Sequence, residues 1–236
     1  MTRRRWIADE VSGNQAFLTG QHARHLAQVL RARVGQEFDI SASGEVRRGT
    51  IVRVGPERVE FELREAVTEA SSAKVTVAIS IFKFDRMEWA IEKCTELGVE
   101  RIIPVIAGRT EKHLATSAAK RVERWRRLVS QASEQSRRVS VPEVDDPVQL
   151  VDVLRIEAGT RIVLSEMERD SSLKDAIPVG SDPVVLAFGP EGGWKNDELT
   201  AFEKAGWISA SLGPTILRVE TAVIAAVAVC ASVLNS

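Results

Sequence analysis

The sequence predicts an α/β protein: a mostly parallel sheet, covered by helices on both faces, preceded by a small β-rich domain. From residue 74 onward, short apolar runs of strand length alternate with helical repeats, which is typical of parallel strands joined by crossover helices. Residues 1 to about 70 instead show short alternating runs between turn residues. A chain of 236 residues is long enough to form both domains.

The first domain is expected over residues 1–70. Strands are predicted at residues 38–40, 49–54 and 58–63, and one helix at residues 22–30. Turn residues such as Gly55-Pro56 separate these elements. Residues 70–73, Ala-Ser-Ser-Ala, are the expected linker.

The second domain is expected over residues 74–236. Its strands are predicted at residues 75–82, 101–106, 161–164, 184–188 and 208–212. Its helices are predicted from residue 85 to 97 and at residues 118–135, 197–205 and 221–234. Asp85 is expected to cap the first of these helices with its side chain, and Gly98 to end it.

Two glycine-bearing loops near the C-terminus carry the strongest functional signal. Phe188-Gly-Pro-Glu-Gly-Gly193 follows one apolar strand, and Leu212-Gly-Pro-Thr-Ile-Leu-Arg-Val-Glu-Thr221 leads into an apolar helix. Each loop should lie at the carboxyl end of a strand, where open α/β sheets bind ligands. Glycine lets the backbone approach a ligand closely. The two loops therefore predict a cofactor cradle beside a reaction centre.

Several other chemistries are not indicated. No Gly-x-Gly-x-x-Gly follows a strand and no Gly-x4-Gly-Lys loop exists, which argues against ordinary dinucleotide and P-loop sites. His22 and His25 have the spacing of a ligand pair but no evident third ligand, so no metal is expected.

The two cysteines form no disulfide framework, and the basic N-terminus is not followed by an apolar signal segment. The apolar stretch 222–231 is too short to span a membrane. We therefore expect a soluble cytoplasmic protein.

Charge is unevenly distributed along the chain. Residues 101–138 contain ten lysines and arginines but three acidic residues, although the whole chain has a net charge of −1. This segment could bind a polyanion, or it could solvate an exposed helix face.

Taken together, in this order and spacing, the two loops closely resemble the RsmE family of 16S ribosomal RNA (uracil-N3) methyltransferases, within the SPOUT superfamily. Two further segments are also similar to that family. One runs from Lys83-Phe-Asp-Arg-Met-Glu-Trp89 to Glu96-Leu-Gly-Val99, and the other is Ala132-Ser-Glu-Gln-Ser-Arg137. The resemblance implies an N-terminal PUA-like barrel, a C-terminal trefoil knot and a homodimer.

The resemblance further implies S-adenosylmethionine as the cofactor and 16S ribosomal RNA, within the small ribosomal subunit, as the partner. The expected cofactor-binding residues lie in three loops: Leu164, Ser165, Glu166, Phe188, Gly189, Pro190, Glu191, Gly192, Gly193, Leu212, Gly213, Ile216 and Leu217. The arginines expected to contact RNA phosphates are Arg24, Arg31, Arg33, Arg86 and Arg109.

Methyl transfer to N3 of uracil requires loss of the N3 proton. Arg218 is expected to stabilise the resulting anion. Glu191 and Glu220 are candidate proton acceptors, and Glu220 could instead cap the last helix or orient Arg218. The family usually has a second arginine where Thr215 stands, a glycine at Phe84 and a small capping serine at Lys195, so the substrate contacts are expected to differ.

Two other functions remain compatible with the sequence. One is a SPOUT RNA methyltransferase that acts on a ribose 2′-oxygen. The other is a catalytically silent RNA-binding protein that keeps the same pair of domains.

Overall fold

The computed structural model describes residues 5–42, 45–67, 74–136, 138, 140–178, 180 and 183–234. The chain divides into two compact units. The N-terminal unit comprises the chain up to Ser71 and the short segment Ser133–Ser140, and the C-terminal unit comprises the rest. The expected linker at residues 70–73 lies outside the described residues.

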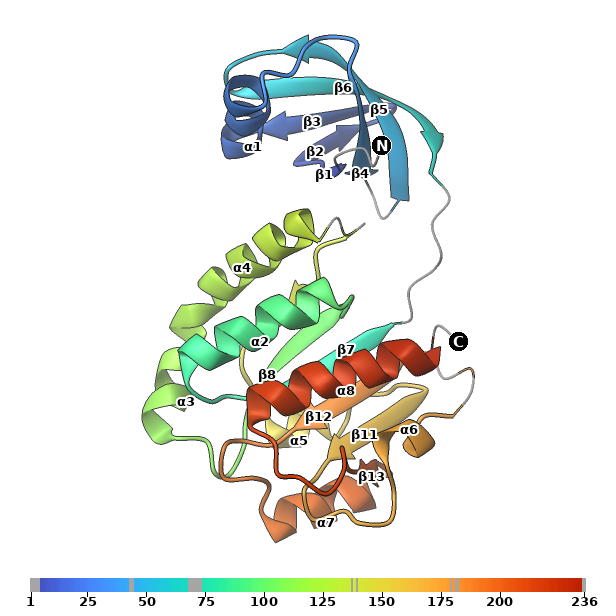
Figure 1. Cartoon of the computed structure of the whole chain (residues 1–236). Coiled ribbons are helices and arrows are strands. Elements are labelled where there is room, and N and C mark those ends of the chain that lie inside the picture. Colours follow the sequence, from blue (N-terminus) through green and yellow to red (C-terminus); the bar gives the residue numbers. More distant parts are fainter. Residues whose placement is uncertain are drawn as a thin grey trace. The chain divides into compact units, whose positions relative to one another are not determined.

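The N-terminal unit is built on a six-stranded sheet in the order β1-β4-β5-β6-β3-β2 (Figure 1). Its strands are β1 Arg5–Ile7, β2 Glu10–Ser12, β3 Gln15–Thr19, β4 Glu37–Ala42, β5 Glu45–Val54 and β6 Arg58–Ala66. β1 pairs with β4 in parallel, and the other pairs are antiparallel.

The edges of this sheet approach each other between β1 and β2. The backbone N–H of Ala8 donates to Ser41 on one side, and that of Asp9 donates to Phe17 on the other, both at 2.9 Å. The sheet therefore curls around a core that includes the fully buried Leu18 and Phe61.

Short elements of this unit differ from the sequence prediction. Strands β1, β2 and β3 were not predicted, because they have three to five residues and little alternation in burial. The helix expected at residues 22–30 is instead a short helix α1, Gly20–Arg24, followed by a π-helical turn, His25–Val29.

The C-terminal unit contains a sheet in the order β10-β8-β7-β12-β11-β13, with β9 beside β8. Its strands are β7 Val75–Ser80, β8 Arg101–Ile106, β9 Glu143–Val144, β10 Val148–Gln149, β11 Thr160–Leu164, β12 Val184–Phe188 and β13 Ile208–Ala210. Every pairing among them is parallel. The mostly parallel sheet is thus confirmed.

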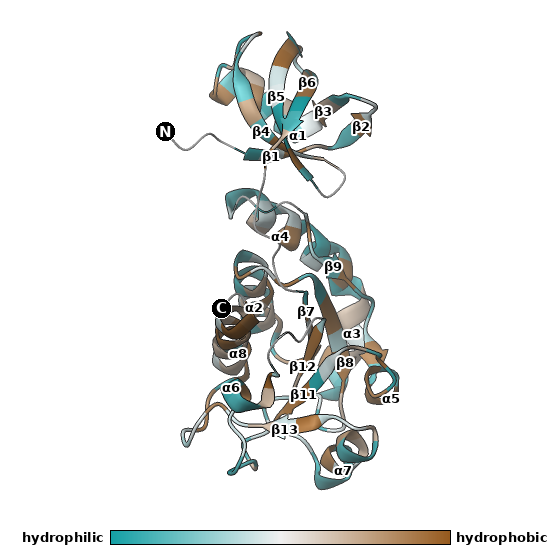
Figure 2. Ribbon diagram, turned by 90° about the vertical axis from the view of Figure 1, so that its right-hand side faces the viewer, coloured by the Kyte–Doolittle hydropathy of each residue, from teal (hydrophilic) through white to brown (hydrophobic). Residues whose placement is uncertain are grey.

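Helices cover both faces of this sheet. They are α2 Phe84–Glu96, α3 Lys112–Ala118, α4 Val122–Gln135, α5 Leu150–Val153, α6 Leu173–Ala176, α7 Asn196–Lys204 and α8 Val219–Leu234. Figure 2 shows α2 and α8 on one face of the apolar sheet and α5 and α7 on the other. Two separate apolar cores result, one under α2 and α8 and one under α5 and α7.

The second core is rich in aromatic rings. Phe202 lies between Trp194 and Trp207, and each pair of ring centroids is 5.0 Å apart in an edge-to-face arrangement. Because α7 carries Phe202 and Trp194 precedes α7, this packing fixes the loop that follows β12.

Three predicted helix starts were wrong. Asp85 does not cap α2: it lies in the first turn, where its charge favours the helix dipole, and Lys83 precedes the helix in an extended conformation. The helix expected at 118–135 begins earlier, at Lys112, and is interrupted by a 3₁₀ turn at Ala119–Arg121. α8 begins at Val219 instead of residue 221.

The described part of the chain contains no helix that combines the length and the apolar character needed to cross a membrane.

Candidate active site

The carboxyl ends of three neighbouring strands frame a cavity in the C-terminal unit. β11 lies between β12 and β13, so the loops that follow these strands leave the same edge of the sheet. The cavity has a volume of about 520 Å³. It is lined by every residue that was predicted to bind the cofactor, from Leu164 to Leu217, and by all three predicted catalytic residues, Glu191, Arg218 and Glu220.

The structure adds other residues to this wall. Arg86 from α2 lines the cavity, as do Ser211, Thr215, Val219 and Ala222. Arg86 was expected to contact RNA, and nothing in its sequence position pointed to this cavity. Thr215, where the resemblance led us to expect an arginine, lies in this wall.

Glycine is needed in the loop after β12 for two reasons. A Cβ on Gly189 would lie 3.2 Å from the backbone nitrogen of Trp194. Gly193 has a φ of +71°, and a Cβ there would run into the carboxylate of Glu166. Glycine is therefore favoured at Gly193 by its positive φ and at Gly189 by the close backbone of Trp194.

Polar side chains fix this loop to its neighbours. The indole Nε1 of Trp194 donates to the carbonyl oxygen of Leu164 at 3.0 Å. Arg109 donates from Nη1 to the carbonyl oxygens of Gly192, at 2.5 Å, and Trp194, at 3.2 Å. Arg109, expected to contact RNA, is exposed and also holds this loop.

A second clamp was missed by the sequence analysis. Glu198 accepts a hydrogen bond from the backbone N–H of Gly108 at 2.7 Å, in the loop after β8, and from that of Lys195 at 2.8 Å. The sequence did contain a signal for this contact. Glu198 stands three residues after Lys195, the residue that precedes α7, and a glutamate at this position is half of a capping box. The clamp joins the loops after β8 and β12.

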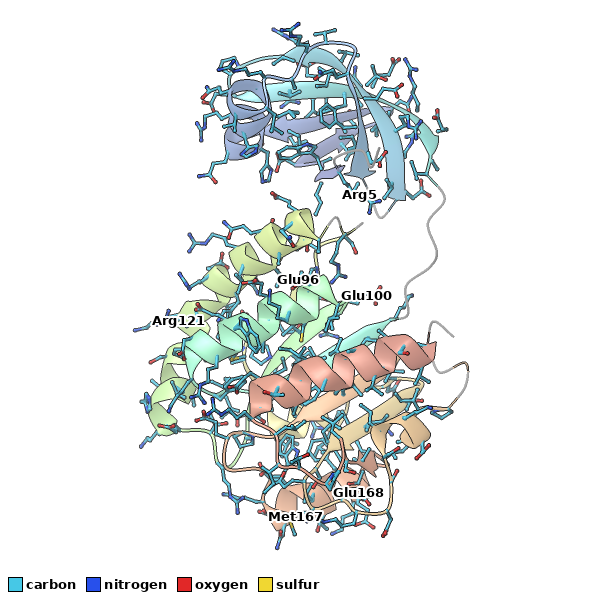
Figure 3. All side chains as sticks on the ribbon, viewed as in Figure 1. Arg5, Glu96, Glu100, Arg121, Met167 and Glu168 are labelled. Carbon is cyan, nitrogen blue, oxygen red and sulfur yellow. The ribbon has the colours of Figure 1, made fainter. Side chains whose placement is uncertain are left out.

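The loop after β11 is organised by one carboxylate. Oε1 of Glu168 accepts hydrogen bonds from the backbone N–H groups of Arg169, Asp170 and Ser171, at 2.9, 2.9 and 3.2 Å. These bonds, chiefly that from Asp170, lower the pKa of Glu168. Figure 3 shows Met167 and Glu168 on this loop, which begins with the cavity residues Ser165 and Glu166.

Charges in the cavity form a connected group. Arg86 Nη1 lies 3.1 Å from Glu191 Oε1, and Arg86 Nε lies 3.8 Å from Glu220 Oε1. Glu220 is 7% exposed, and its Oε2 has no hydrogen-bond partner in the described part of the chain. Because Glu220 lies inside the first turn of α8, the expectation that it caps that helix was wrong.

Arg218 differs from the other cavity charges. It is exposed, and no ion pair or hydrogen bond engages its guanidinium among the described residues. It is therefore the cation of this cavity that is available to a ligand.

The five arginines expected to contact RNA lie in both units. Arg86 and Arg109 hold parts of the cavity. Arg24 pairs with Glu57 at 2.8 Å, whereas Arg31 and Arg33 are exposed and their guanidinium groups have no partner among the described residues. Arg31 is also the only non-glycine residue with a positive φ, +50°, in the described chain.

The basic helix α4 is largely neutralised. Arg124 makes two hydrogen bonds of 2.8 Å to Glu88, and Arg126 contacts Glu123 and Asp146 at 2.8 and 3.2 Å. Arg121, labelled in Figure 3, lies over the ring of Phe84 at 4.9 Å. These contacts favour a solvated helix face over a phosphate-binding surface for this segment.

Known proteins share both the sequence and the fold. A family model described as an RNA methyltransferase domain matches residues 69–231, and one described as an RNA methyltransferase PUA domain matches residues 18–64. The ribosomal RNA small subunit methyltransferase E of Bacillus subtilis is 31% identical, covering 87% of this chain and 85% of the relative. The chain belongs to the ribosomal RNA small subunit methyltransferase E family.

Solved structures agree with membership of the ribosomal RNA small subunit methyltransferase E family. The member from Neisseria gonorrhoeae, bound to S-adenosyl methionine, matches with a TM-score of 0.85 and 31% identity over 99% of this chain and 98% of its own. A methyltransferase from Legionella pneumophila with the same cofactor bound matches with a TM-score of 0.80 and 28% identity, over 97% of both chains. The residues matched by the PUA model lie in the N-terminal unit, and most of those matched by the methyltransferase model lie in the C-terminal unit.

Proposed function

We propose that this protein transfers a methyl group from S-adenosylmethionine to N3 of a uridine in 16S ribosomal RNA of the small ribosomal subunit. The observation that carries the proposal is that one cavity is lined by every residue expected to bind the cofactor and by all three expected catalytic residues. The relatives named above supply the substrate class, and the two solved structures among them hold the cofactor.

The residues of the cavity fit this cofactor. Backbone groups of two of the three loops are accessible because glycine stands at Gly189 and Gly193 after β12 and at Gly213 after β13. Apolar side chains at the rim, including the highly exposed Ile216, offer a surface for a purine ring. Bound there, the cofactor would supply an electrophilic methyl group, and the acidic side chains of Glu191 and Glu220 would favour its cationic sulfonium.

Arg218 is the residue that we assign to the target base. Removal of the N3 proton leaves a negative charge that spreads onto the neighbouring carbonyl oxygens of uracil. A guanidinium directed at those oxygens stabilises the anion as it forms. Arg218 is suited to this role because protein carboxylates do not already engage it.

Glu220 is the better placed of the two candidate proton acceptors. Glu191 is about one-third exposed and hydrogen-bonded to Arg86, whereas Glu220 is nearly buried and retains an oxygen without a partner. A buried acceptor that lacks a donor is costly, and an N–H group of a ligand would satisfy it. We therefore assign the N3 proton to Glu220.

The two units have separate tasks in this proposal. Residues 1–70 form the PUA-like RNA-binding domain, with Arg24, Arg31 and Arg33 as phosphate contacts, and residues 74–236 form the methyltransferase domain. A protein of this kind acts on ribosomal particles in the cytoplasm.

A trefoil knot in the C-terminal portion is also part of the proposal. Two backbone hydrogen bonds, Leu173 N to Ser211 O at 2.8 Å and Ser211 N to Ser171 O at 2.9 Å, lay residues 171–173 against the chain where it leaves β13 for α8. The two segments run side by side as a parallel bridge between Ser172 and Ser211, and this close approach supports a chain that threads a loop. A crystal structure with a continuous trace through residues 165–218 would test the threading.

A homodimer completes the proposal. α8 buries Val223, Ala226 and Val227, yet its opposite side still carries the exposed Ala228 and the half-buried Ile224. A second copy of the chain would cover this apolar side. Sedimentation equilibrium should give twice the monomer mass, and a monomer would contradict the dimer.

One assay tests the function and separates the alternatives. Labelled methyl transfer to small ribosomal subunits and to naked 16S RNA is followed by digestion and nucleoside analysis. We expect 3-methyluridine at one site. A 2′-O-methylated nucleoside would indicate the ribose-modifying alternative, and absence of transfer together with absence of cofactor binding would indicate the silent RNA-binding protein.

A further inference from the structure

Arg86 joins three elements of the methyltransferase unit. It projects from the first turn of α2, and its guanidinium contacts Glu191, in the loop after β12, and Glu220, in the first turn of α8. The distances are 3.1 Å for Nη1 to Glu191 Oε1 and 3.8 Å for Nε to Glu220 Oε1. One side chain therefore connects the two glycine-bearing segments through their carboxylates.

The position of Arg86 in its helix is locally unfavourable. A cation near the N-terminus of a helix interacts unfavourably with the helix dipole, whereas the carboxylate of Asp85 in the same turn interacts favourably with it. Residues that break a local rule commonly do so for a contact elsewhere. The carboxylates of Glu191 and Glu220 are the compensating contact.

The charge of this group argues against phosphate binding by Arg86. One arginine and two glutamates give this group a formal charge of −1. Phosphate contacts require local positive charge that releases counterions. Arg31 and Arg33, which have no carboxylate partner among the described residues, meet that requirement, and Arg86 does not.

Glu220 depends on Arg86 most of all. It is 7% exposed, and Arg86 is the only cation that contacts it among the described residues. A buried carboxylate that loses its counter-charge moves or takes up a proton, because the desolvated anion is then uncompensated. The arginine thus determines where Glu220 lies and whether it can accept a proton.

We propose that Arg86 is a positioning residue of the methyl-transfer site, which holds Glu191 and Glu220 together and keeps Glu220 ready to accept a proton from the target base. The inference rests on the function proposed above. In the reaction, the N3 proton passes to Glu220, the N3–methyl bond forms, and the methyl–sulfur bond breaks with its electron pair left on sulfur.

The test compares Arg86→Gln with Arg101→Gln. Arg101 is a matched control because it also lies beside two carboxylates, Asp145 at 2.7 Å and Glu143 at 3.8 Å, but at the amino end of β8 and outside the cavity. Both variants are assayed for kcat at saturating RNA and cofactor, for RNA affinity at several salt concentrations, and for thermal unfolding.

We expect Arg86→Gln to lower kcat by about tenfold or more, while RNA affinity and its salt dependence stay within about twofold of wild type. Arg101→Gln should leave kcat unchanged. Addition of Glu191→Gln to Arg86→Gln should cause little further loss, because the two residues act as one unit. The unfolding curves show whether each variant is folded.

Two results would overturn the inference. One is a normal kcat for Arg86→Gln. The other is a loss of RNA affinity with a shallower salt slope at unchanged kcat, which would make Arg86 a phosphate contact. A wild-type protein that methylates no uridine would instead refute the proposed function, so the two failures are distinguishable.

Discussion

Arg218 is the residue on which the proposed chemistry depends most. The other cavity arginine, Arg86, is engaged by the carboxylates of Glu191 and Glu220. Among the described residues, Arg218 is therefore the cavity arginine whose guanidinium has no partner.

The variant Arg218→Ala should bind S-adenosylmethionine about as well as wild type. Its rate of methyl transfer should fall by about a hundredfold or more, the effect of losing one donor to a developing anion. Calorimetry measures the affinity and single-turnover transfer measures the rate. Near-normal transfer would remove Arg218 from the mechanism.

A histidine in the N-terminal unit carries a second residue-level prediction. His22 lies between two carboxylates, with Nδ1 2.8 Å from Asp9 and Nε2 2.8 Å from Glu134. The hydrogen bond to Asp9, then that to Glu134, raises the pKa of His22 to about 10. The imidazole should therefore stay protonated at neutral pH.

The stabilising effect of His22 has a defined pH window. Because the pKa of about 10 in the folded protein lies above the ordinary value of 6.5, the contribution is complete below pH 6.5 and is lost as pH rises through 10. An NMR titration should show no deprotonation between pH 6 and 8, and Asp9→Asn should lower the midpoint. A wild-type midpoint near 6.5 would show that the two bonds do not form.

Among the elements, the regular strands were predictable and the contacts between loops were not. β8 and β12 match the predicted ranges residue for residue, because apolar runs of five or six residues between turn signals leave little freedom. α4 was misplaced because helical periodicity does not reveal the 3₁₀ turn at Ala119–Arg121 that precedes it.

In the active site, too, some features could be predicted from the sequence and others could not. Two of the three cofactor loops could be located from glycines that follow apolar strands, and the third, at Leu164–Glu166, followed from the family resemblance. The bonds of Arg86 to Glu191 and of Arg109 to Gly192 join residues 105 and 83 positions apart, and no local pattern encodes such pairs. Both arginines were therefore interpreted as phosphate contacts, which is the usual reading of an arginine in a nucleic-acid enzyme.

The clamp at Glu198 gives a prediction about how two loops are joined. Glu198→Ala removes the acceptor for the N–H groups of Gly108 and Lys195, which should cost about 2 kcal/mol of unfolding free energy. Urea unfolding measures this loss. Glu203→Ala, on the exposed side of the same helix, is the control. Equal stability of the two variants would contradict the clamp.

At the scale of the whole molecule, the two units combine RNA binding with methyl transfer. Fold class followed from the alternation of strands and helices, but the partner and the reaction followed from the resemblance, since net charge and composition are those of an ordinary globular protein. Only the folded chain shows that loops after three different strands share one cavity.

The proposed function depends on cofactor binding in that cavity, and titration of S-adenosylmethionine tests it most directly. Two glycines with positive φ are compared: Gly193 in the cavity wall, and Gly98 at the end of α2, where a Cβ would meet nothing within 4 Å. Both alanine variants carry a similar backbone strain.

Wild type and Gly98→Ala should bind one cofactor per chain with similar affinity. Gly193→Ala should bind at least about fivefold more weakly, because about 1 kcal/mol of strain and the contact with Glu166 displace the loop. Equal binding by all three proteins, or no binding by wild type, would contradict a methyl-donor site at these strand ends.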